Sequence, residues 1–421
     1  MYKVEVLDNG LRIVTAAMPH ARSVSLSIFV GAGSRYEAPE IAGISHFVEH
    51  LCFKGTQRRA TSKEISEAIE GVGGILNGGT DRELTVYWAK VAQPHFPVAL
   101  DVLVDMLRHS KGDPEDVEKE RQVILDELNM IQDSPQQRVD LLLDEVLWPG
   151  QPLGRDVAGT RETVGGMTRE DMLGYMARQY APNNIVVSVA GDIDHGRVVE
   201  SLAHTFADWP RGSPVPWIPA QDSQDALRAK VEHRKTEQVY INLAARGLSL
   251  GHPDRFALDL LSVVLGEGMS SRLFLEMRER QGLAYEVHSY VSHFLDSGAF
   301  TVYAAVDPKR VQDALAAIAQ ELRRLKEKEV PQEELTKAQE MSKGRLLLSM
   351  EDSRSVSGWA GAQMLLRGRI MAVDEILALV DKITAADLRR VAQGLLVPPK
   401  LNLAVVGPLR RDSRLASLLS L

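Results

Sequence analysis

The residues best suited to chemistry lie in one short segment, HFVEH at positions 46–50. On a helix, at about 100° per residue, His46, Glu49 and His50 fall within one narrow arc. Two imidazoles at positions i and i+4 can both reach a Zn²⁺ ion at about 2.0–2.1 Å. Glu49 would then lie beside the ion, where it could take a proton from a water whose pKa the metal lowers to about 7. Their order, H-x-x-E-H, is the reverse of the commoner zinc-binding motif H-E-x-x-H.

A five-residue match also fits an ordinary amphipathic helix with histidines on its surface, so a third ligand is needed to decide. The segment 113–131 predicts a helix with Asp113 as N-cap and Pro114 as its first residue. Glu120 and Glu127 lie two turns apart beside its apolar stripe. Such carboxylates are either solvated or, where buried, paired or bound to a cation. Two histidines and one glutamate with an open fourth position would make a catalytic rather than a structural zinc site.

These side chains need a scaffold of strands and helices. Period-two or β-branched runs predict strands at 24–30 and 83–91, and apolar stripes predict helices at 96–109, 114–131 and 311–325. Because strands and helices do not alternate strictly, the sequence favours the α+β class with a mostly antiparallel sheet.

The chain is organised as an internal repeat around a proline-rich midpoint. Four prolines within 208–219 predict a stiff linker, which we place at 211–220. A single offset of about 216 residues relates positions on its two sides. We therefore expect two homologous α+β domains, 1–210 and 221–421. The matched pairs include Gly31 with Gly247, Tyr87 with Tyr303, Thr168 with Thr384 and Gly191 with Gly407.

The two copies differ at the candidate metal site. The offset places Ser262 and Gly266 where the first copy has His46 and His50. Neither serine nor glycine replaces an imidazole as a zinc ligand. The sequence therefore predicts one zinc ion per chain, in the first domain.

The composition narrows the class of partner. The 421 residues are 44% hydrophobic and 25% charged, as in ordinary globular proteins. A net charge of -8 makes nucleic acid an unfavourable partner, because phosphate binding needs a basic surface. The sequence contains no run of eighteen apolar residues and therefore predicts no membrane span. The single cysteine, Cys52, cannot form an internal disulfide, which favours a reducing, cytoplasmic setting.

The segment HFVEHLCFKGT at 46–56, followed by Glu127 with 76 residues between it and His50, carries a family resemblance. The sequence resembles the pitrilysin-type zinc metallopeptidases, and among them the short bacterial members similar to the β-subunit of the mitochondrial processing peptidase. The resemblance implies that His46, His50 and Glu127 bind the metal and that Glu49 is the general base. It also implies that Glu120 is an accessory carboxylate that supports the site.

The resemblance reaches beyond the metal. It implies that Arg278 and Tyr285, seven residues apart, complete the active site, and that Asn77 helps bind a peptide backbone along a strand edge. It also implies that each chain is half of a clamshell. We expect a homodimer that encloses a chamber and cleaves peptides or unfolded polypeptide segments. The alternative is a non-catalytic or partner-dependent subunit of a related heteromeric peptidase or complex.

Overall fold

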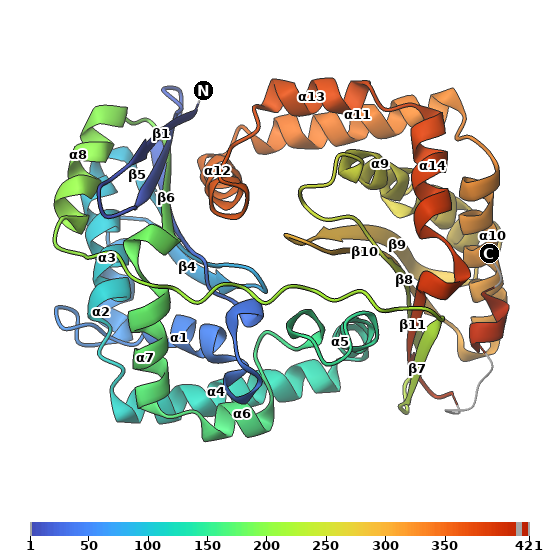
Figure 1. Ribbon diagram of the computed structural model, residues 1–421, viewed down its shortest axis with the longest axis horizontal. Coiled ribbons are helices and arrows are strands. Elements are labelled where there is room, and N and C mark those ends of the chain that lie inside the picture. Colours follow the sequence, from blue (N-terminus) through green and yellow to red (C-terminus); the bar gives the residue numbers. More distant parts are fainter. Residues whose placement is uncertain (1, 410–414, 420–421) are drawn as a thin grey trace. The chain divides into compact units, whose positions relative to one another are not determined.

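The computed structural model describes residues 2–409 and 415–419, which form two compact units (Figure 1). The first unit comprises 2–128, Asp156–Ile218 and Leu347–Ala372. The second comprises Asn129–Arg155, Pro219–Leu346 and the chain from Val373 onward. No helix among the described residues combines the length and apolarity that crossing a membrane requires.

The first unit contains a six-stranded sheet in the order β1-β2-β6-β3-β5-β4. Neighbouring strands are antiparallel except β2 and β6, which are parallel. The strands are β1 (Tyr2–Val6), β2 (Arg12–Ala17), β3 (Ser23–Val30), β4 (Ile75–Thr80), β5 (Thr85–Ala92) and β6 (Ile185–Gly191).

Helices cover both faces of this sheet. One face packs against α1, α3 and α8 in a core that includes Ile28, Phe47, Tyr87 and Leu103, and the other face packs against α12. The helices are α1 (Ile44–Cys52), α2 (Ser62–Glu70), α3 (Phe96–His109), α4 (Pro114–Asp133), α6 (Arg161–Gly166), α7 (Arg169–Gln179), α8 (His195–Phe206) and α12 (Ser353–Arg367).

The second unit repeats this plan with five strands in the order β7-β11-β8-β10-β9. Here too a single neighbouring pair, β7 and β11, is parallel. The strands are β7 (Arg228–His233), β8 (Val239–Arg246), β9 (Ala284–His293), β10 (Gly298–Val306) and β11 (Leu401–Gly407). The helices are α5 (Pro135–Leu147), α9 (Arg255–Gly266), α10 (Val311–Glu327), α11 (Gln332–Ser349), α13 (Val373–Asp381) and α14 (Ala385–Leu395).

The 216-residue offset is visible in the elements themselves. Strands β6 and β11, and helices α7 and α14, begin and end at positions 216 residues apart. Both helices start with the same reciprocal cap, Thr168 with Asp171 in α7 and Thr384 with Asp387 in α14. The predicted α+β class, with two related and mostly antiparallel sheets packed by helices, is confirmed.

Each unit takes one helix from the opposite half of the sequence (Figure 1). Helix α12, from the second half, packs on β3 and β6, and α5, from the first half, packs on β8 and β11. The expected domains 1–210 and 221–421 therefore describe the repeat in the sequence, whereas the compact units are discontinuous. Periodicity shows that a helix has an apolar face, but it does not show which sheet that face covers.

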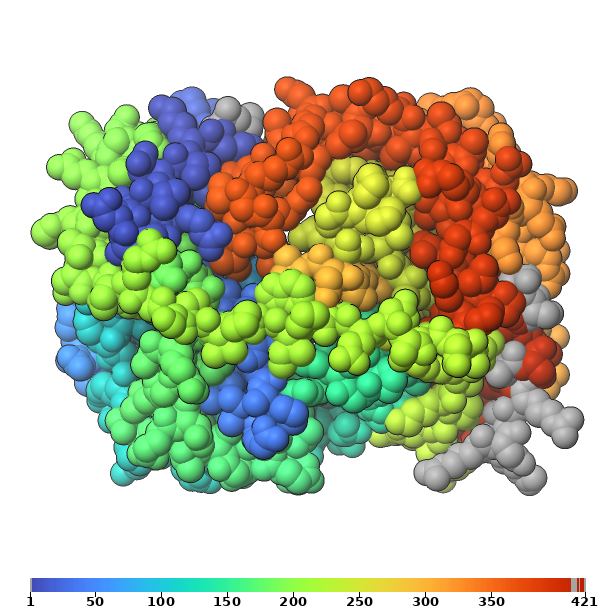
Figure 2. Space-filling model, in the orientation of Figure 1, coloured from blue at the N-terminus to red at the C-terminus, as the bar shows by residue number. Residues whose placement is uncertain are grey.

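The proline-rich segment 208–219 contains no helix or strand and lies on the surface (Figure 2). Its end is fixed to the first unit, because Ile218 and Arg35 exchange two hydrogen bonds of 2.8 and 2.9 Å. The Arg35 guanidinium also lies 4.5 Å from the centre of the Trp217 ring. The segment is thus extended, as its prolines predict, and is held against the first unit up to Ile218.

Candidate metal centre

Helix α1 presents the H-x-x-E-H residues because its other face is buried. Ile44, Phe47, Val48 and Leu51 lie in the core. The buried carboxylate of Glu37 accepts the backbone N–H groups of Gly43 and Ser45 at 2.8 and 2.9 Å, which satisfies the helix start. The helix ends at Cys52, which is buried, as its position on the core side predicts. His46, Glu49 and His50 remain on the opposite face.

His46, His50 and Glu127 converge. The two histidine Nε2 atoms are 3.3 Å apart, and each is 3.7 Å from Oε2 of Glu127. Ligand atoms at tetrahedral corners about 2.1 Å from zinc are separated by about 3.4 Å, so this spacing fits the ion. Among the described residues, this is the group of three whose ligand atoms lie within 4.8 Å of one another. Two imidazole nitrogens and one carboxylate oxygen are donors that zinc accepts.

Glu120, two turns before Glu127 on α4, fixes the ring of His50. Its Oε2 accepts a hydrogen bond from Nδ1 of His50 at 3.0 Å, which leaves the lone pair of Nε2 pointing at the cluster. Burial favours the neutral form of Glu120. The hydrogen bonds from His50 and Lys54 outweigh burial and lower the pKa of Glu120. Glu120 is therefore an ionised support for the cluster.

The pKa values of the two histidines are shifted in opposite directions. Burial, together with the neighbouring His50, lowers the pKa of His46 to about 4, so its ring is neutral in neutral solution. Burial also acts to lower the pKa of His50, but the hydrogen bond to Glu120 and the charges of Glu127 and Glu49 raise it overall. Because zinc binds a neutral imidazole, protonation of His50 competes with the metal, and metal affinity should rise with pH. Nδ1 of His46 is buried without a hydrogen-bond partner among the described residues.

Glu49 is held by the edge strand β4. Oγ1 of Thr80 donates a 2.9 Å hydrogen bond to Oε2 of Glu49. Burial has the largest effect on Glu49 and raises its pKa. The hydrogen bond from Thr80 and the charge of His50 lower this pKa by less, and the charge of Glu127 adds a small further rise. A carboxylate with a raised pKa, one helical turn from the first histidine, is suited to general acid–base chemistry.

The glycine-rich segment that precedes Thr80 is part of β4. Gly-Gly pairs usually mark turns. Gly73 and Gly74 do lie in the turn before β4, whereas Gly78 and Gly79 lie within the strand, where a turn would have been the wrong expectation. A Cβ atom on Gly78 would lie 2.9 Å from the Phe53 ring and 3.0 Å from Oε1 of Glu49, so the glycine gives this carboxylate room. Asn77 is exposed on β4, the terminal strand of the sheet, and its Oδ1 accepts the N–H of Gly78.

Arg278 and Tyr285 lie next to each other in the second unit. Arg278 is in the π-helix Phe274–Arg280, and Tyr285 is the second residue of β9, which follows a turn at Gly282 with φ of +58°. The Arg278 guanidinium lies 5.1 Å from the centre of the Phe274 ring and 5.4 Å from that of Tyr285. Tyr285 is 74% exposed. Both side chains are thus available at the surface of their unit.

The second unit carries no copy of the metal cluster among its described residues. Ser262 on α9 exchanges hydrogen bonds with Ser289, and Gly266 packs directly on the same serine. A Cβ atom on Gly266 would lie 2.4 Å from the backbone nitrogen of Ser289, so no larger residue fits there. Close packing of α9 on β9 occupies the place where a metal would need space.

Sequence reasoning gave no role to two residues that contact the glutamates next to the cluster. Lys54 contacts Glu120, and Thr80 contacts Glu49. The signal for Lys54 was its position four residues after His50, just beyond the helix and in line with the histidines. Thr80 had no such signal, because it reaches Glu49 from a strand.

The structure contains two related α+β units, and the first of them brings two histidines and a glutamate together beside a further glutamate. These features assign the protein to the class of two-domain proteins with an H-x-x-E-H motif. The chain belongs to peptidase family M16. Residues 12–161 match the family model described as "Insulinase (Peptidase family M16)", and residues 166–342 match "Peptidase M16 inactive domain". The predicted family is confirmed.

Relatives and solved structures agree with this assignment. The chain is 38% identical to an uncharacterized zinc protease of Streptomyces coelicolor, over 96% of this chain and 89% of that protein. It is 37% identical to one of Bacillus subtilis, over 93% and 94%. The crystal structure of a protease from Helicobacter pylori has a TM-score of 0.93 at 24% identity and covers 97% of this chain and 99% of its own. Because the sequence identity is only 24%, this comparison shows that the two proteins share a fold and nothing more.

Proposed function

We propose that this protein is a zinc-dependent endopeptidase that binds one ion per chain and cleaves peptides or unfolded polypeptide segments. The observation that carries the proposal is the convergence of His46, His50 and Glu127, with Glu49 on the same helix face. The spacing of the three ligand atoms suits tetrahedral zinc. The zinc-protease names of the bacterial relatives support the choice of ion.

The residues around the cluster divide the work of hydrolysis. A divalent ion held by the three ligands would supply an acidified water and polarise the scissile carbonyl. Glu49 accepts a proton from the attacking water and passes it to the leaving amine. Its raised pKa brings proton uptake and release closer to neutral pH. Glu120 keeps the lone pair of His50 aimed at the metal position.

Strand β4 offers a place for the substrate backbone. It pairs with β5 on one side and is the last strand in the order of its sheet. An extended peptide added to such an edge would be held by main-chain hydrogen bonds and so accepted with little regard to its side chains. The strand ends at Thr80, which contacts Glu49, so a peptide aligned along Asn77 would pass the general base.

The second unit supplies the remaining predicted residues. Arg278 and Tyr285 are neighbouring side chains whose donors would suit an oxyanion or a peptide carbonyl. We propose that they act in a homodimer, on the metal site of the partner chain, within an enclosed chamber. We also propose the cytoplasm as the setting, since the single Cys52 is buried and unpaired.

A partner-dependent or non-catalytic subunit is the second candidate. It is favoured by the "inactive domain" description of residues 166–342, which include Arg278 and Tyr285. The intact cluster of the first unit favours catalysis by this chain.

Substitution of the general base tests the proposed activity. Glu49→Gln should bind zinc as the unaltered protein does, because Glu49 is not one of the three converging ligands. It should lose hydrolysis of an unstructured peptide by about 100-fold or more, the usual share of a general base. The measurement pairs zinc analysis of the purified protein with peptide cleavage followed by mass spectrometry. Full activity in Glu49→Gln would remove Glu49 from this role.

A further inference from the structure

Lys54, two residues beyond the end of α1, contacts the carboxylate that supports the metal cluster. Its Nζ lies 2.7 Å from Oε1 of Glu120, while Oε2 of the same carboxylate accepts the hydrogen bond from His50 at 3.0 Å. Glu120 is only 4% exposed. The terminal torsion of a glutamate is broad, so one hydrogen bond alone leaves the carboxylate free to turn. Here both oxygens are engaged, one by the histidine and one by the lysine.

The backbone that carries Lys54 is itself fixed. The N–H of Lys54 bonds to the carbonyl of Leu51 at 3.1 Å, which closes the last turn of α1. The carbonyl of Gly55 accepts the N–H of Lys111 at 3.1 Å, and the N–H of Thr56 bonds to the carbonyl of Arg59 at 2.6 Å. These bonds tie the turn after α1 to the segment after α3.

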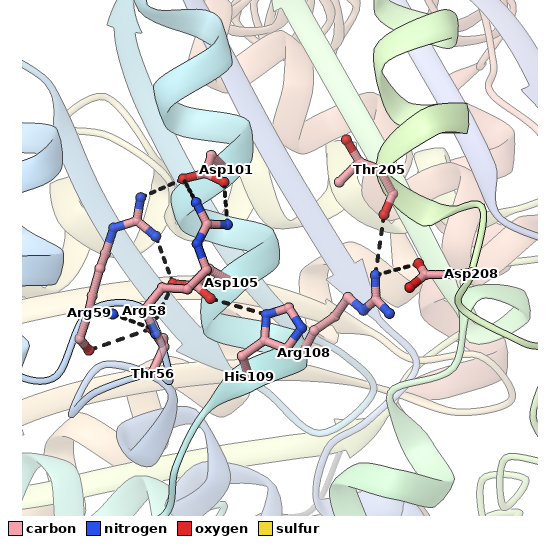
Figure 3. A network of polar contacts seen from close by, with 9 residues as sticks. All are labelled: Thr56, Arg58, Arg59, Asp101, Asp105, Arg108, His109, Thr205 and Asp208. Carbon is pink, nitrogen blue, oxygen red and sulfur yellow. Dashed lines mark hydrogen bonds and ion pairs between the residues drawn. The ribbon is translucent and has the colours of Figure 1, made fainter.

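A buried carboxylate on α3 locks the same turn (Figure 3). Asp105 is 1% exposed, and its Oδ2 accepts hydrogen bonds from Oγ1 of Thr56 at 2.6 Å and from Arg59 at 2.7 Å. Its Oδ1 lies 3.1 Å from Nδ1 of His109. A buried carboxyl group that is hydrogen-bonded by several donors gives a rigid anchor, because the loss of any donor would leave a buried oxygen unsatisfied. Lys54 therefore extends toward Glu120 from a backbone with little freedom.

We propose that Lys54 is a positioning residue of the metal centre, whose ammonium holds the Glu120 carboxylate so that it orients His50 toward the ion. The proposal rests on the metal site of the proposed function and adds a residue that the H-x-x-E-H pattern does not contain. It also places an ammonium group against a carboxyl group that is itself next to the metal cluster.

Two substitutions at Lys54 and one matched control test this role. Lys54→Met keeps most of the side-chain stem and removes the charge and the donors, whereas Lys54→Arg keeps both. The control is Lys90→Met, because Lys90 is 31% exposed against 32% for Lys54 and also pairs with a carboxylate, that of Asp352. Zinc affinity is measured on the full chain in competition with a chelating dye, and kcat and KM with an unstructured peptide.

We expect Lys54→Met to weaken zinc binding by about tenfold, the lower end of the effect of losing a group that supports a metal-bound histidine. It should lower kcat with little change in KM, and the unfolding temperature of the metal-free protein should stay near that of the unaltered protein. Lys54→Arg should recover most of both losses. Lys90→Met should bind zinc normally.

Unchanged zinc affinity and kcat in Lys54→Met would overturn the proposal. So would a Lys54→Arg variant as weak as Lys54→Met, or an equal loss in Lys90→Met, since neither pattern follows from the contact with Glu120. Failure of the unaltered protein to bind zinc would instead contradict the proposed function. The two failures are therefore distinguishable.

Discussion

Among single residues, Thr80 has the most direct influence on Glu49. Its hydroxyl donates to one carboxylate oxygen and lies 3.4 Å from the hydroxyl of Thr85, the first residue of β5. The hydrogen bond from Thr80 favours the ionised form of Glu49 and partly offsets the burial that raises the pKa of this carboxyl. Thr80 thereby keeps a buried carboxylate able to accept a proton.

Removal of this hydroxyl should shift the pH dependence of catalysis. Thr80→Val takes away a lowering effect, so the pKa of Glu49 should rise further. Because Glu49 accepts a proton only when ionised, the acidic limb of the kcat/KM profile should move to higher pH. On that limb, kcat/KM should fall by about tenfold, the worth of one hydrogen bond to a charged group. The measurement is peptide hydrolysis across the acidic range.

Thr80→Ser keeps the donor and serves as the control, with a profile close to that of the unaltered protein. An acidic limb that stays in place in Thr80→Val would show that Thr80 does not influence the ionisation of Glu49.

The residues of the cluster were accessible to sequence reasoning because their spacing is local. The i, i+4 histidines and the two glutamates seven residues apart each lie on one helix, where periodicity predicts a common face. The structure brings His46, His50 and Glu127 together, and their roles as ligands stay predictions. Thr80 escaped notice because no spacing rule connects a helix with the strand beside it.

At the level of elements, α12 is fitted closely to the first sheet. The hydroxyl of Ser357 donates a 2.8 Å hydrogen bond to the carbonyl of Ser188 and lies 2.9 Å from the hydroxyl of Ser27. A Cβ atom on Gly361 would lie 2.2 Å from the Phe29 ring and 2.9 Å from Cβ of Ser188, so only glycine allows this approach. The glycine is therefore a packing requirement within a helix that would otherwise favour alanine.

Gly361→Ala should destabilise the protein by about 1–3 kcal/mol, the usual cost of overpacking a filled core. Gly174→Ala is the matched control, because Gly174 also lies within a helix of the first unit and a Cβ atom there meets nothing within 4 Å. It should be neutral or stabilising by up to about 1 kcal/mol. Urea unfolding of the metal-free proteins measures both. Equal stability of the two variants would contradict the close fit of α12.

Elements with strong local signals were predicted well. The predicted helix 96–109 has the bounds of α3, and the helix that starts at Pro114 extends two residues beyond the expected end. Strand β4 was missed because its glycines have no strand preference of their own, and pairing with β5 stabilises them. The packing of α5 on the second sheet and of α12 on the first sheet was also missed, because helix periodicity does not show which sheet a helix covers.

For the molecule as a whole, the proposed division of labour between two chains can be tested by mixing. Glu49→Gln and Arg278→Ala should each be nearly inactive alone. If the arginine of one chain serves the metal of the other, a mixed dimer contains one site with both groups intact. Free exchange of subunits should then restore about a quarter of the full activity, as expected for a symmetric dimer. The measurement is peptide hydrolysis after co-incubation of the two variants.

Absence of recovery would contradict the sharing of sites, provided that size-exclusion chromatography of differently tagged chains shows mixed dimers. As a further control, two Glu49→Gln preparations with different tags should remain inactive after mixing.

The passage of α12 to the first sheet has a consequence for how the protein is made. While the ribosome is still synthesising the second half, β3 and β6 already exist, but the face that carries Phe29 and Val186 lacks its cover. That apolar surface stays open to water, or to a chaperone, until the residues of α12 emerge. A nascent chain that stops at the proline-rich midpoint therefore lacks part of the first unit. This unit can be completed only after most of the second half of the chain has been synthesised.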